Sequence, residues 1–317
     1  EEIWKDESIE IVINTTYPGA HYEIAKASLE AGKNVYSEKM ITETLNEADE
    51  LMKLAEEKNV YQCGAPDTFL GASLQTARYV LDSGIIGTPV AAQAVLMRSY
   101  HHERFYTGDE KRFAFCPGGG IIFDMGSYYL TALVFLLGAI RRVCGFSQIR
   151  DAKRIYQNPN SPHYQEEMLV ESWNNVAGTL EFENGVLCNL LTSSESGAFQ
   201  HNFVIYGTEG KLILADPNNF GDPVYIQMKK GDQLQVPITH GFGDAARGLG
   251  VADLAYAIRN HRRPRTEGAL TRHVLEAALG ICESSRTEQT YSMLTRCERP
   301  EPLQPGYTEY QEMVLDL

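Results

Sequence analysis

The sequence IEIVINTTYPGAHYEIAKASLEAGKNVYSEK, residues 9–39, decides the fold class. Residues 9–16 form a β-branched run with the length of a buried strand. Residues 21–32 place apolar side chains at helical spacing, and Gly32 provides a stop for that helix. Residues 34–39 read as a second short strand. A strand, a helix and a strand in this order predict a parallel βαβ unit.

The same alternation continues along the chain. It predicts an amphipathic helix with a Thr or Asn cap, a third strand and another helix at residues 44–59, 60–66 and 70–84. We therefore expect a doubly wound parallel sheet, in which ligands bind at the carboxyl ends of the strands. Those ends fall at residues 15–21, 38–40 and 65–68.

After about Gly87 the pattern changes to alternating runs joined by turns. The turn signals are Asn184-Gly185, Glu209-Gly210 and Gly231-Asp232, which predict antiparallel hairpins. Two helical stretches follow at residues 244–263 and 269–287. The whole pattern predicts an α/β plus α+β protein, with a parallel domain followed by a larger domain on an open, mainly antiparallel sheet.

Length and charge exclude several classes of protein. A chain of 317 residues exceeds one ordinary core and favours two domains. The formal net charge of −14 argues against a nucleic-acid partner, because phosphate backbones are bound by clustered Lys and Arg. No apolar run reaches the roughly 18 residues of a membrane span, so we predict no membrane partner.

The cysteines give a prediction about the compartment. All six are scattered without a C-x-x-C spacing, which favours neither a zinc site nor a disulfide framework. We therefore expect reduced thiols and a cytoplasmic protein. The chain opens with Glu1 and carries no signal segment, so we expect either a missing start or a shortened chain.

The segment GGGIIFDMGSYYL, residues 118–130, carries the most unusual polar residues. Asp124 lies four residues before Tyr128, so a helix here would turn both side chains toward one cleft. Taken alone, Asp124 is equally a helix cap and Tyr128 a packing residue. His101, His102 and Glu103 match no metal-ligand spacing, so we predict no metal site and interpret them as a surface or pocket loop.

Taken together, these segments closely resemble the Gfo/Idh/MocA oxidoreductases, the family of glucose–fructose oxidoreductase and inositol dehydrogenase. The resemblance runs in order through INTTYPGAHYEIAKASLEAGKNVYSEKM, LMKLAEEKNVYQCGAPDTF, GGGIIFDMGSYYLTALVFLLG, AGTLEFENGV and IYGTEGKL. Its most specific element is the Glu-Lys pair at residues 38–39 together with the glycine, Asp and Tyr segment. It implies a truncated Rossmann-like dinucleotide-binding domain at residues 1–68, and a substrate-binding and oligomerisation domain at residues 69–317.

The resemblance also implies an activity and its residues. It implies an NAD(P)-dependent oxidoreductase that transfers hydride at a carbinol carbon of a sugar, cyclic polyol or related carbohydrate. The implied catalytic residues are Lys39, Asp124 and Tyr128, with Lys39 lowering the pKa of the phenol so that it can accept a proton. The implied cofactor contacts are Thr16, Tyr17, His21, Glu38 and Lys39. His240 and Arg247 are weaker candidates for substrate contact.

Two departures keep an alternative open. The Gly-x-Gly-x-x-Gly fingerprint and its following acid are absent, so NAD and NADP cannot be distinguished, and we expect weak cofactor binding by the chain as given. Met40 also stands where the family usually has proline. These points favour a non-catalytic member that acts as a ligand-sensing or assembly module. In either case the sheet alternation predicts a homo-oligomer, a dimer or tetramer.

Overall fold

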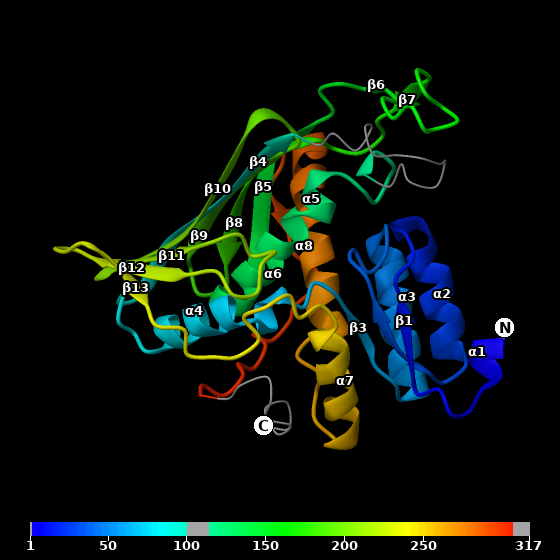
Figure 1. Ribbon diagram of the computed structural model, residues 1–317, viewed down its shortest axis with the longest axis horizontal. Helices are drawn as coiled ribbons and strands as arrows, with labels where there is room; N and C mark the ends of the chain where they lie inside the picture. Colours follow the sequence, from blue (N-terminus) through cyan, green and yellow to red (C-terminus); the bar gives the residue numbers. More distant parts are fainter. Residues whose placement is uncertain (1, 100–113, 307–317) are drawn as a thin grey trace.

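The computed structural model describes residues 2–99 and 114–306. Its smaller sheet has three parallel strands in the order β1-β2-β3, with the helices α2 and α3 packed beside it (Figure 1). The elements of this part are α1 Glu2–Lys5, β1 Ile11–Asn14, α2 Pro18–Glu30, β2 Asn34–Ser37, α3 Leu45–Lys58, β3 Gln62–Gly64 and the short 3₁₀ helix η1 Thr68–Leu70. The predicted βαβ order and parallel pairing are therefore confirmed.

Local signals explain where these helices begin and end. Thr44 caps α3 through a capping box, in which its hydroxyl accepts from the Glu47 amide and the Glu47 carboxylate accepts from the Thr44 amide. Asn59 ends the same helix in the left-handed conformation. Pro18 opens α2, where its fixed φ suits a first helical turn.

The larger sheet has nine strands in the order β13-β12-β11-β10-β4-β9-β8-β5-β14. Its pairings are antiparallel except between β4 and β9, which run parallel. Its strands are β4 Pro89–Ser99, β5 Ile140–Gln148, β8 Asn175–Phe182, β9 Leu187–Ser193, β10 Glu195–Gly207, β11 Gly210–Leu214, β12 Val224–Met228, β13 Gln233–Val236 and β14 Tyr291–Ser292. The three predicted hairpins join β8 to β9, β10 to β11 and β12 to β13. A separate pair, β6 Lys153–Ile155 and β7 Glu167–Leu169, extends from one end.

Helices cover the face of the large sheet that is turned toward the small one (Figure 1). They are α4 Ala72–Asp82, α5 Ile121–Asp124, α6 Gly126–Leu137 and α8 Gly268–Thr287. Every residue of α6 is buried, which suits a helix that is apolar on all sides. The opposite face of the sheet has no helix over it in the described part of the chain, as expected for an open sheet.

One late helix returns to the small sheet. Helix α7, Leu249–Arg259, places the buried Leu254 against Tyr36 of β2 and Cys63 of β3. Val35, the neighbour of Tyr36, belongs instead to the core that includes Ala25 and Leu29 of α2. Successive strand residues face opposite sides, so α7 and α2 cover the two faces of this sheet.

Candidate active site

The loop after β1 is organised by the buried amide of Asn14. The Asn14 Oδ1 atom accepts a hydrogen bond from the Thr16 hydroxyl at 2.7 Å, and its Nδ2 atom donates to the His21 carbonyl at 3.0 Å. The exposed Tyr17 ends the loop as the N-cap of α2. Asn14 is a residue that sequence reasoning missed, although its place at a strand end was a usable signal.

His21 connects the loop after β1 to the loop after β2. Its side chain is fully buried, with Nδ1 2.6 Å from the Met40 carbonyl and Nε2 3.1 Å from the Thr16 carbonyl. The imidazole therefore links the loop after β1 to the loop after β2. This geometry assigns His21 to positioning the two loops.

Lys39 and Asp124 connect the two domains. Lys39 follows β2, and its Nζ atom lies 2.8 Å from Oδ1 of Asp124, the last residue of α5. Both side chains are largely shielded, at 16% and 17% exposure. The Lys39 Nζ atom also lies 5.4 Å from the centroid of the Tyr128 ring. The structure thus brings the three predicted catalytic side chains together.

Asp124 and Tyr128 lie on two successive helices and not on one continuous helix. Helix α5 ends at Asp124, Met125 interrupts it, and α6 begins at Gly126. Tyr128 therefore lies in the first turn of a second helix. The break still leaves both side chains beside Lys39, so the predicted proximity holds without the predicted helical turn.

The pKa values of Lys39 and Tyr128 are both raised above their ordinary values, but for different reasons. Burial alone would lower the pKa of Lys39, but Asp124 and Tyr128 hold it above its ordinary value. Burial raises the pKa of Tyr128 above its ordinary value, while Lys39 and Arg247 act to lower it. The expected lowering by Lys39 is present, but burial outweighs it. The phenol is therefore protonated at neutral pH.

Two glycines before Asp124 allow close backbone contacts with the protein itself. A Cβ atom on Gly118 would lie 2.7 Å from Cγ of Glu43, and one on Gly120 would lie 2.7 Å from the carbonyl oxygen of Trp173. Both glycines also have positive φ, which other residues rarely adopt. Gly118 thus sets the segment before α5 against the first domain, and Gly120 sets it against the segment before β8, so Asp124 is positioned between them.

A cavity of about 200 Å³ opens at the carboxyl ends of β1 and β2. Four predicted cofactor contacts line it, whereas the fifth, His21, lies behind them. The lining residues are Thr16, Tyr17, Pro18, Glu38, Lys39, Met40, Gly118, Gly119, Phe123 and Asp124. Residues from both domains therefore share one cavity at the predicted edge of the sheet.

A guanidinium group completes the surroundings of Tyr128. The Nη1 atom of Arg247 donates to the Tyr128 phenol oxygen at 3.1 Å. Arg247 precedes α7, and sequence reasoning ranked it only as a weak candidate for substrate contact. His240 lies elsewhere, bonded to Thr239 and to the Leu303 carbonyl, and burial lowers its pKa.

The remaining sequence candidates are the residues of the segment His101, His102 and Glu103. Residues 101–103 lie outside the described residues. Within residues 2–99 and 114–306, no group of three His, Cys, Asp or Glu side chains could hold a metal ion. No helix in the same part of the chain is long and apolar enough to cross a membrane.

Comparison with known proteins agrees with the architecture. Residues 1–64 match the model of an oxidoreductase family with an NAD-binding Rossmann fold, and residues 74–213 match the GFO/IDH/MocA C-terminal domain. These two matches define a Rossmann-type domain joined to an open-sheet domain. The chain belongs to the Gfo/Idh/MocA family of oxidoreductases.

Individual relatives are more distant. An uncharacterized oxidoreductase of Schizosaccharomyces pombe is 30% identical over 254 residues, 77% of this chain and 61% of the relative. The chain thus spans about three fifths of that protein. The 1,5-anhydro-D-fructose reductase of Ensifer adhaerens is 24% identical over 309 residues, which cover 93% of this chain and 83% of the reductase. Levoglucosan dehydrogenase in complex with NADH superposes with a TM-score of 0.79 at 18% identity, covering 93% of this chain and 82% of the other.

Proposed function

We propose that the protein is an NAD(P)-dependent oxidoreductase that transfers hydride at a carbinol carbon of a sugar, cyclic polyol or related carbohydrate. The observation that carries this proposal is the shielded Lys39–Asp124 ion pair beside the Tyr128 phenol. Oxidation of an alcohol removes a proton from oxygen while hydride leaves carbon, so a proton-accepting side chain is needed there. A non-catalytic module would not require an acid, a lysine and a tyrosine from separate elements in one place.

The cavity fits the nicotinamide end of such a cofactor. It lies at the carboxyl ends of two parallel strands, where doubly wound sheets bind nucleotides. Thr16, Tyr17 and Glu38 would contact the cofactor, and Lys39 would contact both cofactor and substrate. When bound, the cofactor supplies the hydride acceptor or donor. NAD and NADP differ at the 2′-position of the adenosine ribose, which is at the other end of the cofactor from the nicotinamide.

The other steps, which are substrate binding and proton transfer, depend on side chains of this protein. Asp124, held by Lys39, is placed to orient a substrate hydroxyl by accepting a hydrogen bond from it. Tyr128 takes the hydroxyl proton during oxidation and returns it to the carbonyl oxygen during reduction. His21 links the two loops, and Asn14 holds the loop after β1 in place. This division needs no metal ion.

Carbohydrate substrates are supported by the names of two relatives. One acts on 1,5-anhydro-D-fructose and the other on levoglucosan. The test measures reduced nicotinamide by absorbance with NAD⁺ or NADP⁺ and a panel of levoglucosan, D-glucose and myo-inositol, and the reverse reaction with 1,5-anhydro-D-fructose. Lys39→Met should abolish turnover and weaken cofactor binding. The protein for this test is expressed from its full coding sequence. If it then binds neither cofactor and converts no member of the panel, the result favours the sensing or assembly module.

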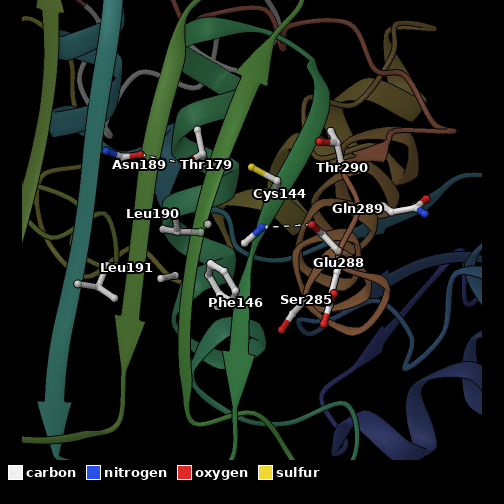
Figure 2. Close-up of a pocket in the computed structure, with 14 residues that line it drawn as sticks. Cys144, Phe146, Thr179, Asn189, Leu190, Leu191, Ser285, Glu288, Gln289 and Thr290 are labelled. Atoms are coloured by element: carbon white, nitrogen blue, oxygen red, sulfur yellow. Dashed lines mark hydrogen bonds between the residues drawn. The ribbon is translucent and has the colours of Figure 1, made fainter.

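We further propose that the open face of the large sheet pairs with a second copy. This face includes outward side chains of β5, β8 and β9, among them Phe146, which is 81% exposed, and Leu187, which is 52% exposed. Figure 2 shows Cys144 beside Thr179, which is hydrogen-bonded to Asn189, and Phe146 further along β5; all four line a depression of about 780 Å³. A second copy would cover these apolar groups, which are costly to leave in water.

We propose the cytoplasm as the location. Cys63, Cys188 and Cys282 are free thiols that are buried among other side chains. Free thiols of this kind are usual in reducing compartments. Localisation of a tagged protein by fluorescence microscopy tests this point.

A further inference from the structure

The hydrogen bond to the Tyr128 phenol oxygen comes from Arg247. Its Nη1 atom is 3.1 Å from that oxygen, and its guanidinium carbon is 5.4 Å from the ring centroid. Lys39 also lies 5.4 Å from the ring centroid, but its ammonium group donates to Asp124. The two cations therefore have different partners, and within residues 2–99 and 114–306 only the arginine donates a hydrogen bond to the reacting oxygen.

Arg247 is held in place from two sides. Its Nη2 atom donates to both the carbonyl and the Oδ1 atom of Asn218. The next residue, Gly248, has φ of 99° and caps α7. The buried Asp67 carboxylate accepts from the amides of Gly248 and Gly250 at 2.9 and 3.1 Å. Asp67 thereby fixes the start of α7, and with it Arg247, to the end of the first domain.

We propose that Arg247 is a catalytic residue that stabilises the phenolate form of Tyr128 during proton transfer. This inference rests on the proposed function. In oxidation, the substrate O–H bond breaks and its proton forms an O–H bond with Tyr128, while the hydride leaves for the bound nicotinamide. A guanidinium group stays charged at all working pH values, so it supports the phenolate without competing for the proton. Its hydrogen bond to a phenolate is stronger than the bond to a neutral phenol.

Other charges also face Tyr128. Lys39 and Glu38 approach from the loop after β2, Asp124 from α5, and Arg247 from the loop before α7. The two carboxylates oppose ionisation of the phenol, and the two cations favour it. Lys39 is paired directly with Asp124, which offsets part of its field. Asp67 in turn faces Arg247 across the Gly248 amide.

The first test measures ionisation of the phenol without any substrate. The protein is labelled with 3-fluorotyrosine, and the ¹⁹F signals are followed against pH. The fluorine atom lowers the phenol pKa, so the titration takes place at a lower pH, where the protein is still folded. The chain has 17 tyrosines, so Tyr128→Phe identifies the relevant signal. Arg247→Met should raise the Tyr128 pKa by about one to two pH units, the size expected for a lost charged hydrogen bond.

Two further variants sharpen this test. Arg247→Lys should give an intermediate shift, because an ammonium keeps the charge and loses the planar fork. Arg296→Met removes an exposed arginine that pairs with Glu183, and should leave the Tyr128 titration unchanged. An Arg247→Met titration that coincides with the wild type overturns the proposal.

The second test measures turnover. Arg247→Met should lower kcat for oxidation about 10- to 100-fold at neutral pH, with the loss decreasing as the pH rises, because hydroxide then ionises the phenol. The cofactor Kd should stay within about twofold. A change confined to KM would assign Arg247 to substrate binding and overturn the catalytic role. If the wild type converts no substrate, the proposed function fails and the catalytic role with it, while the titration still shows whether Arg247 controls the phenol.

Discussion

Tyr128 is the residue on which the proposed chemistry depends. Tyr128→Phe keeps the ring beside Lys39 and removes the oxygen that carries the proton. We expect turnover to fall about 10²- to 10⁴-fold, as for other lost acid–base groups, while the cofactor Kd changes little. Tyr129→Phe is a matched control, because the Tyr129 hydroxyl is buried without a hydrogen-bond partner in the described part of the chain. Equal activity of the wild type and Tyr128→Phe on every substrate would return Tyr128 to a packing role.

The raised pKa of Tyr128 gives the reaction a direction-dependent pH profile. Burial raises this pKa above its ordinary value, so the phenol is already protonated through neutral pH. Reduction uses the phenol as an acid, so its rate should stay flat through neutral pH and fall only above the raised pKa. Oxidation uses the phenolate, so its rate should rise with pH over the same range. Stopped-flow measurement of the hydride step in both directions checks these signs, and parallel profiles would contradict them.

His273 predicts how stability depends on pH. Burial lowers its pKa from 6.5 to about 4. Its Nε2 atom accepts from the Ile140 amide, and its Nδ1 atom lies 2.8 Å from the Thr295 hydroxyl, so a second proton would break the bond to Ile140. The unfolded chain binds this proton below pH 6.5, but the folded chain does so only near pH 4. The free energy of unfolding should therefore fall by about 3 kcal/mol between these values.

Urea unfolding at a series of pH values measures this loss. His273→Gln retains an acceptor for the Ile140 amide and cannot titrate, so its unfolding free energy should fall less steeply between pH 6.5 and 4. The difference between the two proteins isolates His273 from the carboxylates that also titrate in this range. Identical slopes would show that His273 does not govern the acid side of the stability curve.

At the scale of single elements, local signals account for much that could be predicted. The Asn184-Gly185 turn predicted the β8–β9 hairpin, because Gly185 adopts a φ of 86° that favours glycine. The pairing of β4 with β9 was not predictable in this way. It joins strands that are distant in sequence, and nothing in either strand specifies a parallel neighbour. The break between α5 and α6 at Met125 was not predictable either, because the residues on both sides of it have a sequence typical of a helix.

Glycines of the large sheet let helix α8 pack closely on it, which gives a prediction about the stability of the contact between β8 and α8. A Cβ atom on Gly178 of β8 would lie within 2.9 Å of Ile281 of α8. Gly178→Ala should therefore lower the free energy of unfolding by about 1–3 kcal/mol. Ile281→Ala should lower it by about 2–5 kcal/mol, because it leaves a cavity. The double variant should lose less than the sum, since each change relieves the other, and additive losses by urea unfolding would refute this close contact.

At the scale of the whole molecule, the site depends on contacts that sequence patterns cannot supply. Lys39 and Asp124 are 85 residues apart, and Arg247 is 119 residues from Tyr128. The family resemblance pointed to Lys39, Asp124 and Tyr128 because they lie in recognisable segments. Arg247 lies in a loop whose position depends on α7 returning to the first sheet and on the buried Asp67. Such long-range packing explains why its bond to the phenol was not foreseen.

The open face of the large sheet carries the prediction about assembly. A pair of copies related by a twofold axis would place the same residues on both sides of the interface. Phe146→Glu adds one charge from each copy to that interface, where neither can be solvated well. Light scattering at micromolar concentration should give a mass of two or four chains of 35.4 kDa for the wild type and half that mass for the variant.

A control for this experiment lies on the other domain. Ile3 is 54% exposed and belongs to α1, which lies beside α2 on the side of the molecule away from the large sheet in Figure 1. Ile3→Glu should therefore leave the mass unchanged. Both variants change an exposed apolar residue to the same acid, so a difference between them locates the interface. If the wild type is already a clean monomer at this concentration, the open face does not pair copies of this chain. If both variants keep the wild-type mass, the copies associate through another surface.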